Sequence, residues 1–113
     1  MELETRVINN IIIFDLKGEI RRSLEDSPTL HQHVKNHLNE GKRNFILNFD
    51  KIDFIDSFAI GELVASLKSI NDLGGKLKLI KLPPRIKLLF KITMLERIFK
   101  IYDDEEEALK NFS

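Results

Sequence analysis

Residues 44–80 have the sequence NFILNFDKIDFIDSFAIGELVASLKSINDLGGKLKLI, and the change of pattern along this stretch decides the fold. Residues 44–49 are an apolar run dense enough to be buried on both faces, which indicates a central strand. From Ser57 onward the apolar residues recur at helical spacing, and the Gly74-Gly75 pair stops the helix. Alternation returns in residues 76–82, so the stretch predicts a strand–helix–strand unit. The helix positions expected to face the core are Ile60, Leu63, Val64, Leu67, Ile70 and Leu73.

The N-terminal side of this unit adds a hairpin and a helix. Asn9-Asn10 can adopt the positive φ angles of a tight turn, and the segment Ile11–Leu16 after it is β-branched and aromatic. Gly18 is expected to end that strand. A helix follows, with Ser27 as its cap and Pro28 at its first position. Its predicted core positions are Leu30, Val34 and Leu38, and Gly41 is expected to end it.

The C-terminal side continues the alternation of helix and strand. Pro83-Pro84 ends the strand of residues 76–82, and residues 85–95 predict a short helix with Ile86, Leu89 and Phe90 inward. Residues 97–102 predict a last strand, and residues 103–112 a last helix with an acidic first turn. The pattern therefore predicts an α/β fold, a mixed, largely parallel five-stranded sheet packed with about four helices.

Length and composition describe an ordinary globular chain. Its 113 residues suit a single domain, residues 1–113, that buries a core without disulfides or metal. Lys and Arg (18) balance Asp and Glu (18), so no overall charge attracts nucleic acid or an anionic membrane. The chain has no cysteine, its start does not resemble a signal peptide, and its longest apolar run is IIIF. We therefore expect a cytoplasmic protein with no direct nucleic-acid partner and no membrane partner.

Three histidines on the first helix, His31, His33 and His37, are the first candidates for chemistry. His33 and His37 have the spacing of the metal-binding H-E-x-x-H motif, but Val34 stands where that motif has its glutamate. No third ligand is evident nearby, so a solvated helix face is the preferred interpretation.

Asp50, Asp53 and Asp56 are the second candidates, because they recur every three residues. Along an extended segment this spacing places neighbours on opposite faces, which argues against a shared acid–base or magnesium site. The chain also lacks the phosphate-binding, dinucleotide-binding and nucleophile-elbow motifs. We therefore expect no enzyme activity, no catalytic residue, no metal site and no cofactor.

Ser57 is the remaining candidate. A serine before an amphipathic helix needs no role beyond that of an N-cap. However, Phe58 lies off the predicted core face, and Gly61 inside the helix costs about 1 kcal/mol relative to alanine. Both features favour a surface that a partner approaches closely. A phosphate on Ser57 would meet the amides of the first helical turn while adding about two negative charges beside Asp53 and Asp56.

Nearly the whole chain resembles the STAS domain of the bacterial anti-sigma-factor antagonist family. The similarity covers IIIFDLKGEI, residues 44–80 with their Asp-Ser signature and Gly-Gly turn, and LPPRIKLLFKITMLERIFKIYDDEEEAL. In that family the serine directly after the aspartate is phosphorylated by an anti-sigma factor that is also a serine kinase, and a PP2C-type phosphatase reverses this. The resemblance implies that Ser57 is the phosphoacceptor and that the unphosphorylated protein binds the anti-sigma factor and frees a sigma factor.

The predicted binding surface for this partner combines the helix start with the loop after the second strand. It comprises Asp56, Ser57, Phe58, Gly61, Arg21 and Ser23, since loops at the carboxyl ends of parallel strands border the usual site. The alternative is a STAS scaffold that is never phosphorylated, because Phe58 and Ala59 stand where the family usually has Ser or Thr and then Gly. We expect a monomer or a weak dimer.

Overall fold

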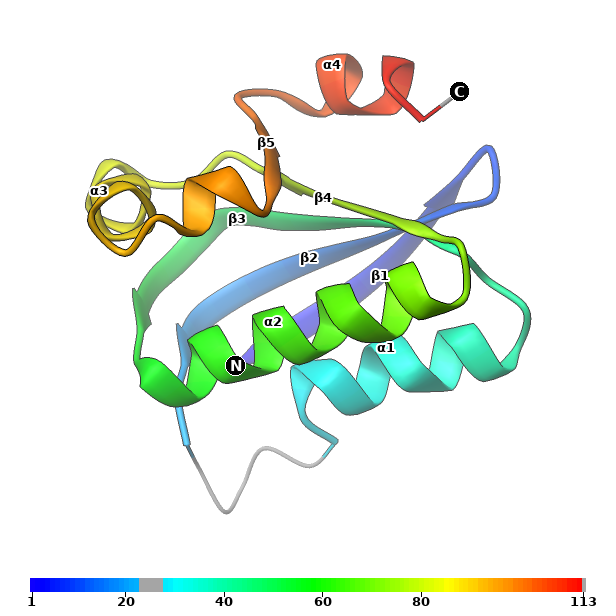
Figure 1. Cartoon of the computed structure of the whole chain (residues 1–113), viewed down its shortest axis with the longest axis horizontal. Coiled ribbons are helices and arrows are strands. Elements are labelled where there is room, and N and C mark those ends of the chain that lie inside the picture. The colour runs from blue at the N-terminus through cyan, green and yellow to red at the C-terminus, as the bar shows by residue number, and fades with distance from the viewer. Residues whose placement is uncertain (23–27, 113) are drawn as a thin grey trace.

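The computed structural model describes residues 1–22 and 28–112, which form one five-stranded sheet with helices on both faces (Figure 1). The strand order is β1-β2-β3-β4-β5; β1 is antiparallel to β2, and the other neighbours are parallel. The predicted α/β fold is therefore confirmed. The strands are β1 (Glu2–Ile8), β2 (Ile11–Ile20), β3 (Asn44–Ile55), β4 (Lys76–Ile80) and β5 (Lys100–Tyr102). The helices are α1 (Leu30–Asn39), α2 (Ser57–Asp72), α3 (Pro84–Ile92), the 3-10 turn η1 (Leu95–Arg97) and α4 (Glu105–Lys110).

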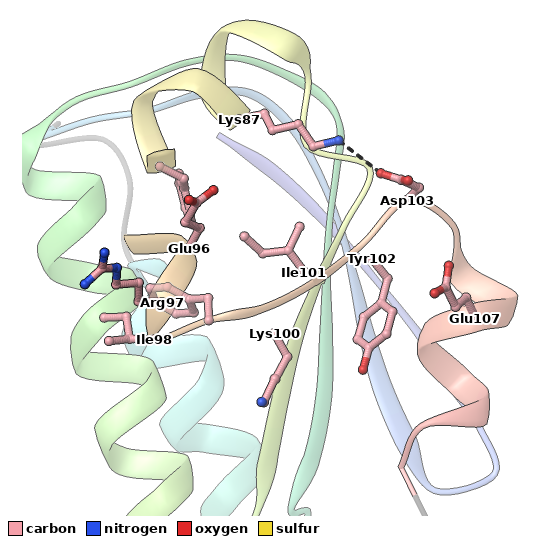
Figure 2. Close-up of a pocket in the computed structure, with 11 residues that line it drawn as sticks. Lys87, Glu96, Arg97, Ile98, Lys100, Ile101, Tyr102, Asp103 and Glu107 are labelled. Atoms are coloured by element: carbon pink, nitrogen blue, oxygen red, sulfur yellow. Dashed lines mark hydrogen bonds and ion pairs between the residues drawn. The ribbon is translucent and has the colours of Figure 1, made fainter. Parts of the chain in front are cut away.

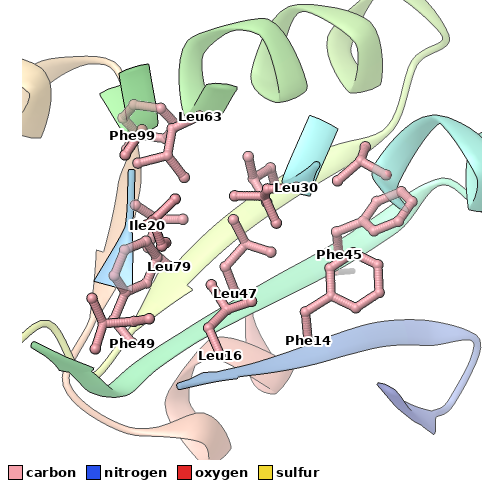
Figure 3. Close-up of a cluster of buried hydrophobic side chains, with 14 of the residues drawn as sticks. Phe14, Leu16, Ile20, Leu30, Phe45, Leu47, Phe49, Leu63, Leu79 and Phe99 are labelled. Carbon is pink, nitrogen blue, oxygen red and sulfur yellow. The ribbon is translucent and has the colours of Figure 1, made fainter. Parts of the chain in front are cut away.

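Strand β3 is the centre of the sheet, as its dense apolar run predicts. It pairs with β2 on one side and β4 on the other, and its first residues are buried from both faces. Helices α1 and α2 lie side by side on one face, whereas α4 lies on the other (Figure 1). The larger core fills the face of α1 and α2 and includes Phe14, Phe45, Leu47, Phe49 and Leu63 (Figure 3). Under α4 a smaller cluster contains Ile11, Ile13, Ile46, Ile80 and Ala108.

The opening hairpin is confirmed in its turn and extended in its second strand. Asn9 and Asn10 have φ angles of 52° and 66°, as the tight turn requires. Gly18 does not end β2, which continues to Ile20. Gly18 instead has a φ of 95° at a shift in the β2–β3 register, so the glycine accommodates an irregularity inside the strand.

Helix α1 begins later than the sequence pattern suggests. Its N-cap is Thr29, whose side chain accepts a hydrogen bond from the Gln32 amide at 3.3 Å while the Gln32 side chain accepts one from the Thr29 amide at 2.7 Å. This reciprocal capping box satisfies two amides, which explains why the helix starts there and not at Pro28. Ser27, the predicted cap, lies outside the described residues.

The last strand is shorter than predicted. Residues 95–97 form η1, which follows Met94 in a left-handed conformation at φ 63°, so only Lys100–Tyr102 pair with β4. The predicted last helix is present as α4, capped by Asp104, whose carboxylate accepts a hydrogen bond from the Glu107 amide at 2.8 Å. A short β5 leaves part of β4 at an open edge of the sheet.

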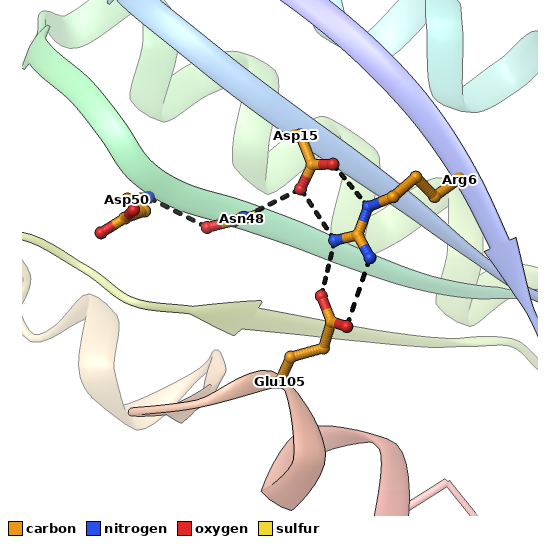
Figure 4. A network of polar contacts seen from close by, with 5 residues as sticks. All are labelled: Arg6, Asp15, Asn48, Asp50 and Glu105. Atoms are coloured by element: carbon orange, nitrogen blue, oxygen red, sulfur yellow. Dashed lines mark hydrogen bonds and ion pairs between the residues drawn. The ribbon is translucent and has the colours of Figure 1, made fainter.

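A polar network attaches α4 to the first two strands (Figure 4). Arg6 of β1 lies 2.6 Å from a carboxylate oxygen of Asp15 and 2.6 Å from one of Glu105, and Asn48 donates to Asp15 at 2.8 Å. The hydrogen bond from Arg6 is the main cause that holds the pKa of Asp15 below its usual range. These contacts fix the orientation of α4 on its face of the sheet.

Candidate functional site

The candidate site is the start of α2, where β3 leaves the sheet. Asp56 is the N-cap of this helix, with an extended backbone and a side chain that accepts a hydrogen bond from the Ala59 amide at 2.9 Å. Ser57 is the first helical residue and is exposed. The expectation of Ser57 as the cap is wrong, because the aspartate before it already satisfies the amide of the third helical residue. The Ser57 hydroxyl is consequently not needed for capping.

The end of β2 lies directly against this helix start. Ile20 pairs with Ile55, the Asp56 amide donates to the Ile20 carbonyl at 3.3 Å, and the Arg22 amide donates to the Asp56 carboxylate at 3.3 Å. Hydrogen bonds from backbone amides, first that of Ala59, lower the pKa of Asp56 below its usual range, so the carboxylate is charged at neutral pH. Tertiary structure thus brings together two segments that are more than thirty positions apart in the sequence.

The predicted loop residues after β2 are described only in part. Arg21 is exposed and its guanidinium lies 3.1 Å from the Glu19 carboxylate. Arg22, which the sequence pattern did not single out, places its guanidinium 5.5 Å from the centre of the Phe58 ring. Ser23 lies outside the described residues. Phe58 is half-buried, so its ring does not stand free of the domain.

An exposed stripe runs along α2 from Ser57. Ser57, Gly61, Val64 and Lys68 are all exposed, and their spacing of four, three and four residues places them on one side of the helix. Val64 is 39% exposed, so the prediction that it faces the core is wrong, and Leu73 is likewise 51% exposed. We call Ser57, Gly61, Val64 and Lys68 the α2 stripe.

Small residues on α2 explain why the helix is rotated away from the predicted orientation. Its buried positions are Ala59, Leu63, Ser66 and Ile70, and the Ser66 hydroxyl donates to the Glu62 carbonyl at 2.7 Å within the helix. Alanine and serine carry little hydrophobic signal, so the apolar pattern placed the core face toward Val64 instead. The rotation leaves the α2 stripe free on the surface.

An apolar hollow adjoins the same end of the sheet, and the sequence pattern did not reveal it. Phe54 is 45% exposed at the end of β3, and Leu88 and Ile92 of α3 are 56% and 69% exposed. Together with Asp53, Ile55, Arg85, Ile86 and Leu89 they line a cavity of about 280 Å³. The sequence feature that could have indicated this hollow is the pair Leu88 and Ile92. These apolar residues are four positions apart, on the side of α3 away from the buried Ile86 and Phe90.

The sequence predicts a solvated helix face for the three histidines, whereas in the structure each of them is half-buried. The His37 ring lies edge-on to Phe14 with centroids 5.3 Å apart, and His31 Nε2 is 2.8 Å from the Ser69 hydroxyl. Desolvation lowers the pKa of His31 and of His33. Within residues 1–22 and 28–112, no three His, Cys, Asp or Glu residues are grouped so that they could hold a metal ion.

The three aspartates Asp50, Asp53 and Asp56 do not form a common site. Asp50 and Asp53 are exposed on β3, and only Asp56 takes part in the helix start.

A further cavity of about 600 Å³ lies along β5 between α3 and α4, where Lys87 and Asp103 are 3.1 Å apart, and none of the predicted site residues lines it (Figure 2). In the described part of the chain no helix is long and apolar enough to cross a membrane.

Comparison with known proteins gives consistent matches along this chain. The family model of the STAS domain matches residues 2–108. A relative from Thermotoga neapolitana, described as a homologue of a candidate anti-sigma factor antagonist, is 40% identical over 73 residues, which is 65% of each chain. The anti-sigma-B factor antagonist of Staphylococcus aureus is 27% identical over 106 residues, 94% of this chain and 96% of its own. The crystal structure of a candidate anti-sigma factor antagonist from Thermotoga maritima has a TM-score of 0.84 at 28% identity, covering 97% of this chain and 93% of its own.

Proposed function

The chain belongs to the STAS domain family, and from this we propose that it is an anti-sigma-factor antagonist whose binding is switched off by phosphorylation of Ser57. The unphosphorylated form binds an anti-sigma factor that is also a serine kinase, and this binding frees a sigma factor. A PP2C-type phosphatase restores the unphosphorylated form. Support for the antagonist role comes from the names of the relatives, and support for the switch comes from the geometry around Ser57.

The observation that carries the proposal is the position of Ser57 at the head of the α2 stripe. Because Asp56 caps the helix, the Ser57 hydroxyl is exposed and available to a kinase. The stripe behind it contains Gly61, around which a side chain would meet open space, and the apolar Val64. A partner can therefore lie close to the helix backbone there and bury an apolar group beside the hydroxyl.

A phosphate at Ser57 would change the charge of this surface sharply. It adds about two negative charges next to the Asp56 carboxylate, which is already ionised and already uses the Ala59 and Arg22 amides. Burying these charges in an interface is expensive unless the partner pairs them. Two positive side chains at the end of β2, Arg21 and Arg22, lie beside Glu19 and the Phe58 ring respectively. Phosphorylation should therefore oppose binding rather than promote it.

The apolar hollow supports a second candidate function. Phe54, Leu88 and Ile92 form an exposed apolar surface that does not include Ser57. A STAS scaffold that assembles with other proteins and is never phosphorylated could use this surface alone. The two functions differ in whether Ser57 is modified and in whether modification changes affinity.

The experiment incubates the full chain with the cognate anti-sigma kinase and ATP, then measures intact mass and affinity. We expect one phosphoryl group on the wild type and on the control Ser69→Ala, and none on Ser57→Ala. Phosphorylation should weaken binding at least about tenfold, a factor equal to about 1.4 kcal/mol, whereas Ser57→Ala should bind normally. Modification at another residue, or equal affinity before and after it, would favour the scaffold.

A further inference from the structure

The open edge of β4 creates a cavity that is separate from the Ser57 site. Strand β5 pairs only with residues 78–80 of β4, which leaves Lys76 and Leu77 without a neighbouring strand on that side. A cavity of about 450 Å³ lies at this gap. Leu67 and Asn71 of α2 border it on one side of the sheet, and Asn111, at the end of α4, borders it on the other.

Three lysines line this cavity, and we refer to it as the lysine cavity. Lys78 of β4 pairs in register with Lys100 of β5, so their side chains project to the same face. Lys76 is two residues before Lys78 and projects to that face as well. Like charges directly opposite each other destabilise a sheet, so the arrangement has an energetic cost that an anion would remove.

Among the described residues, no carboxylate balances the positive charges of the lysine cavity. Of the described residues that line the lysine cavity, none is an aspartate or a glutamate. Within residues 1–22 and 28–112, none of the ion pairs at 4.0 Å or less involves Lys76, Lys78 or Lys100. Lys76 donates to the backbone carbonyl of Phe112 at 3.2 Å, a neutral acceptor, so among the described residues no carboxylate balances its charge.

Lys78 lies in the interior of the cavity wall. It is only 5% exposed, and buried lysines are almost always paired. Here its ammonium lies 5.0 Å from the centres of both the Tyr102 and Phe112 rings and 3.3 Å from the Tyr102 hydroxyl. Aromatic rings stabilise the cation without cancelling its charge, so Lys78 is positioned but remains able to attract an anion.

We propose that the lysine cavity binds a small ligand that carries two adjacent phosphate groups. Three ammonium groups match the charge of a diphosphate, whereas a single carboxylate would leave most of it unpaired. The amides of Asn71 and Asn111 are further polar groups at the cavity border, and its volume falls within the range of small-ligand sites. Lys100 and Tyr102 stand on the edge strand β5 (Figure 2), where Lys100 is exposed and Tyr102 is half-buried.

The test titrates the isotope-labelled full chain with inorganic pyrophosphate and follows its backbone amide resonances. We expect shifts concentrated at residues 75–78, 100 and 111, and weaker binding of inorganic phosphate. Lys100→Gln should weaken pyrophosphate binding about fivefold or more, the factor of one unit-charge contact at 4 Å in water. Lys78→Met, which removes the charge but retains an apolar stem, should weaken it at least as much.

Lys17→Gln is the matched control, because Lys17 is exposed on β2 and lies 4.0 Å from the Glu2 carboxylate, outside the cavity. It should bind pyrophosphate as the wild type does. An absence of shifts at millimolar pyrophosphate, shifts centred on other residues, or equal binding by Lys100→Gln and wild type would overturn the proposal. An acidic peptide that binds while pyrophosphate does not would also overturn it. The outcome is independent of the Ser57 proposal, since the two sites share no residue.

Discussion

Replacing Leu63 by alanine tests which side of α2 faces the core. Leu63 is fully buried in the larger core, whereas its neighbour Val64 is 39% exposed on the α2 stripe. Truncating a buried leucine removes its transfer free energy and leaves a cavity, which together cost about 2 to 5 kcal/mol. For Val64→Ala the smaller hydrophobic loss is offset by the better helix propensity of alanine, so the change should stay within about 0.5 kcal/mol.

Urea unfolding followed by circular dichroism measures both variants. The shift of the urea midpoint equals the loss of stability divided by the slope of free energy against urea concentration, which is about 1 to 3 kcal/mol/M. A loss of about 3 kcal/mol therefore lowers the midpoint by about 1 to 3 M, so Leu63→Ala should be easily resolved from wild type. Val64→Ala should unfold at nearly the wild-type midpoint and serves as the matched control. If the two variants lose similar stability, or if Val64→Ala loses more, the orientation of α2 described above is wrong and the α2 stripe is not a surface.

Two further predictions concern the glycines and the helix cap. Gly61→Ala should stabilise the domain by about 0.5 to 1 kcal/mol, because the added Cβ meets open space, yet it should weaken partner binding. Gly75→Ala should destabilise the domain by more than about 2 kcal/mol, because the added Cβ would overlap the Arg43 carbonyl oxygen. Urea midpoints measure both changes in stability, and a binding assay measures the effect of Gly61→Ala on the partner. The pKa of Asp56 is lowered in the folded state, so its charge contributes stability that is present above the unfolded value near 4 and is lost as pH falls through the folded value. The stability gap between wild type and Asp56→Asn should therefore be constant near neutral pH and narrow below about pH 4, and a gap that widens on acidification would contradict this.

The sequence by itself determined the order of the elements and the identity of the central strand. The run of residues 44–49 is too apolar for an edge strand, and Asn9 and Asn10 readily adopt the positive φ angles of a tight hairpin turn. The Asp-Ser pair also identified the start of α2 within one residue. These features depend on local backbone preferences and on side-chain hydrophobicity, which a single sequence displays directly.

Only the tertiary structure decided which surfaces the elements present. The rotation of α2 buries Ala59 and Ser66, and such small side chains give no hydrophobic signal of their burial. The contact between Arg22 and Asp56, the apolar hollow at Phe54, and the lysine cavity all join segments distant in sequence. Such surfaces arise from the register of neighbouring strands and from the length of β5, and packing of the whole domain sets both.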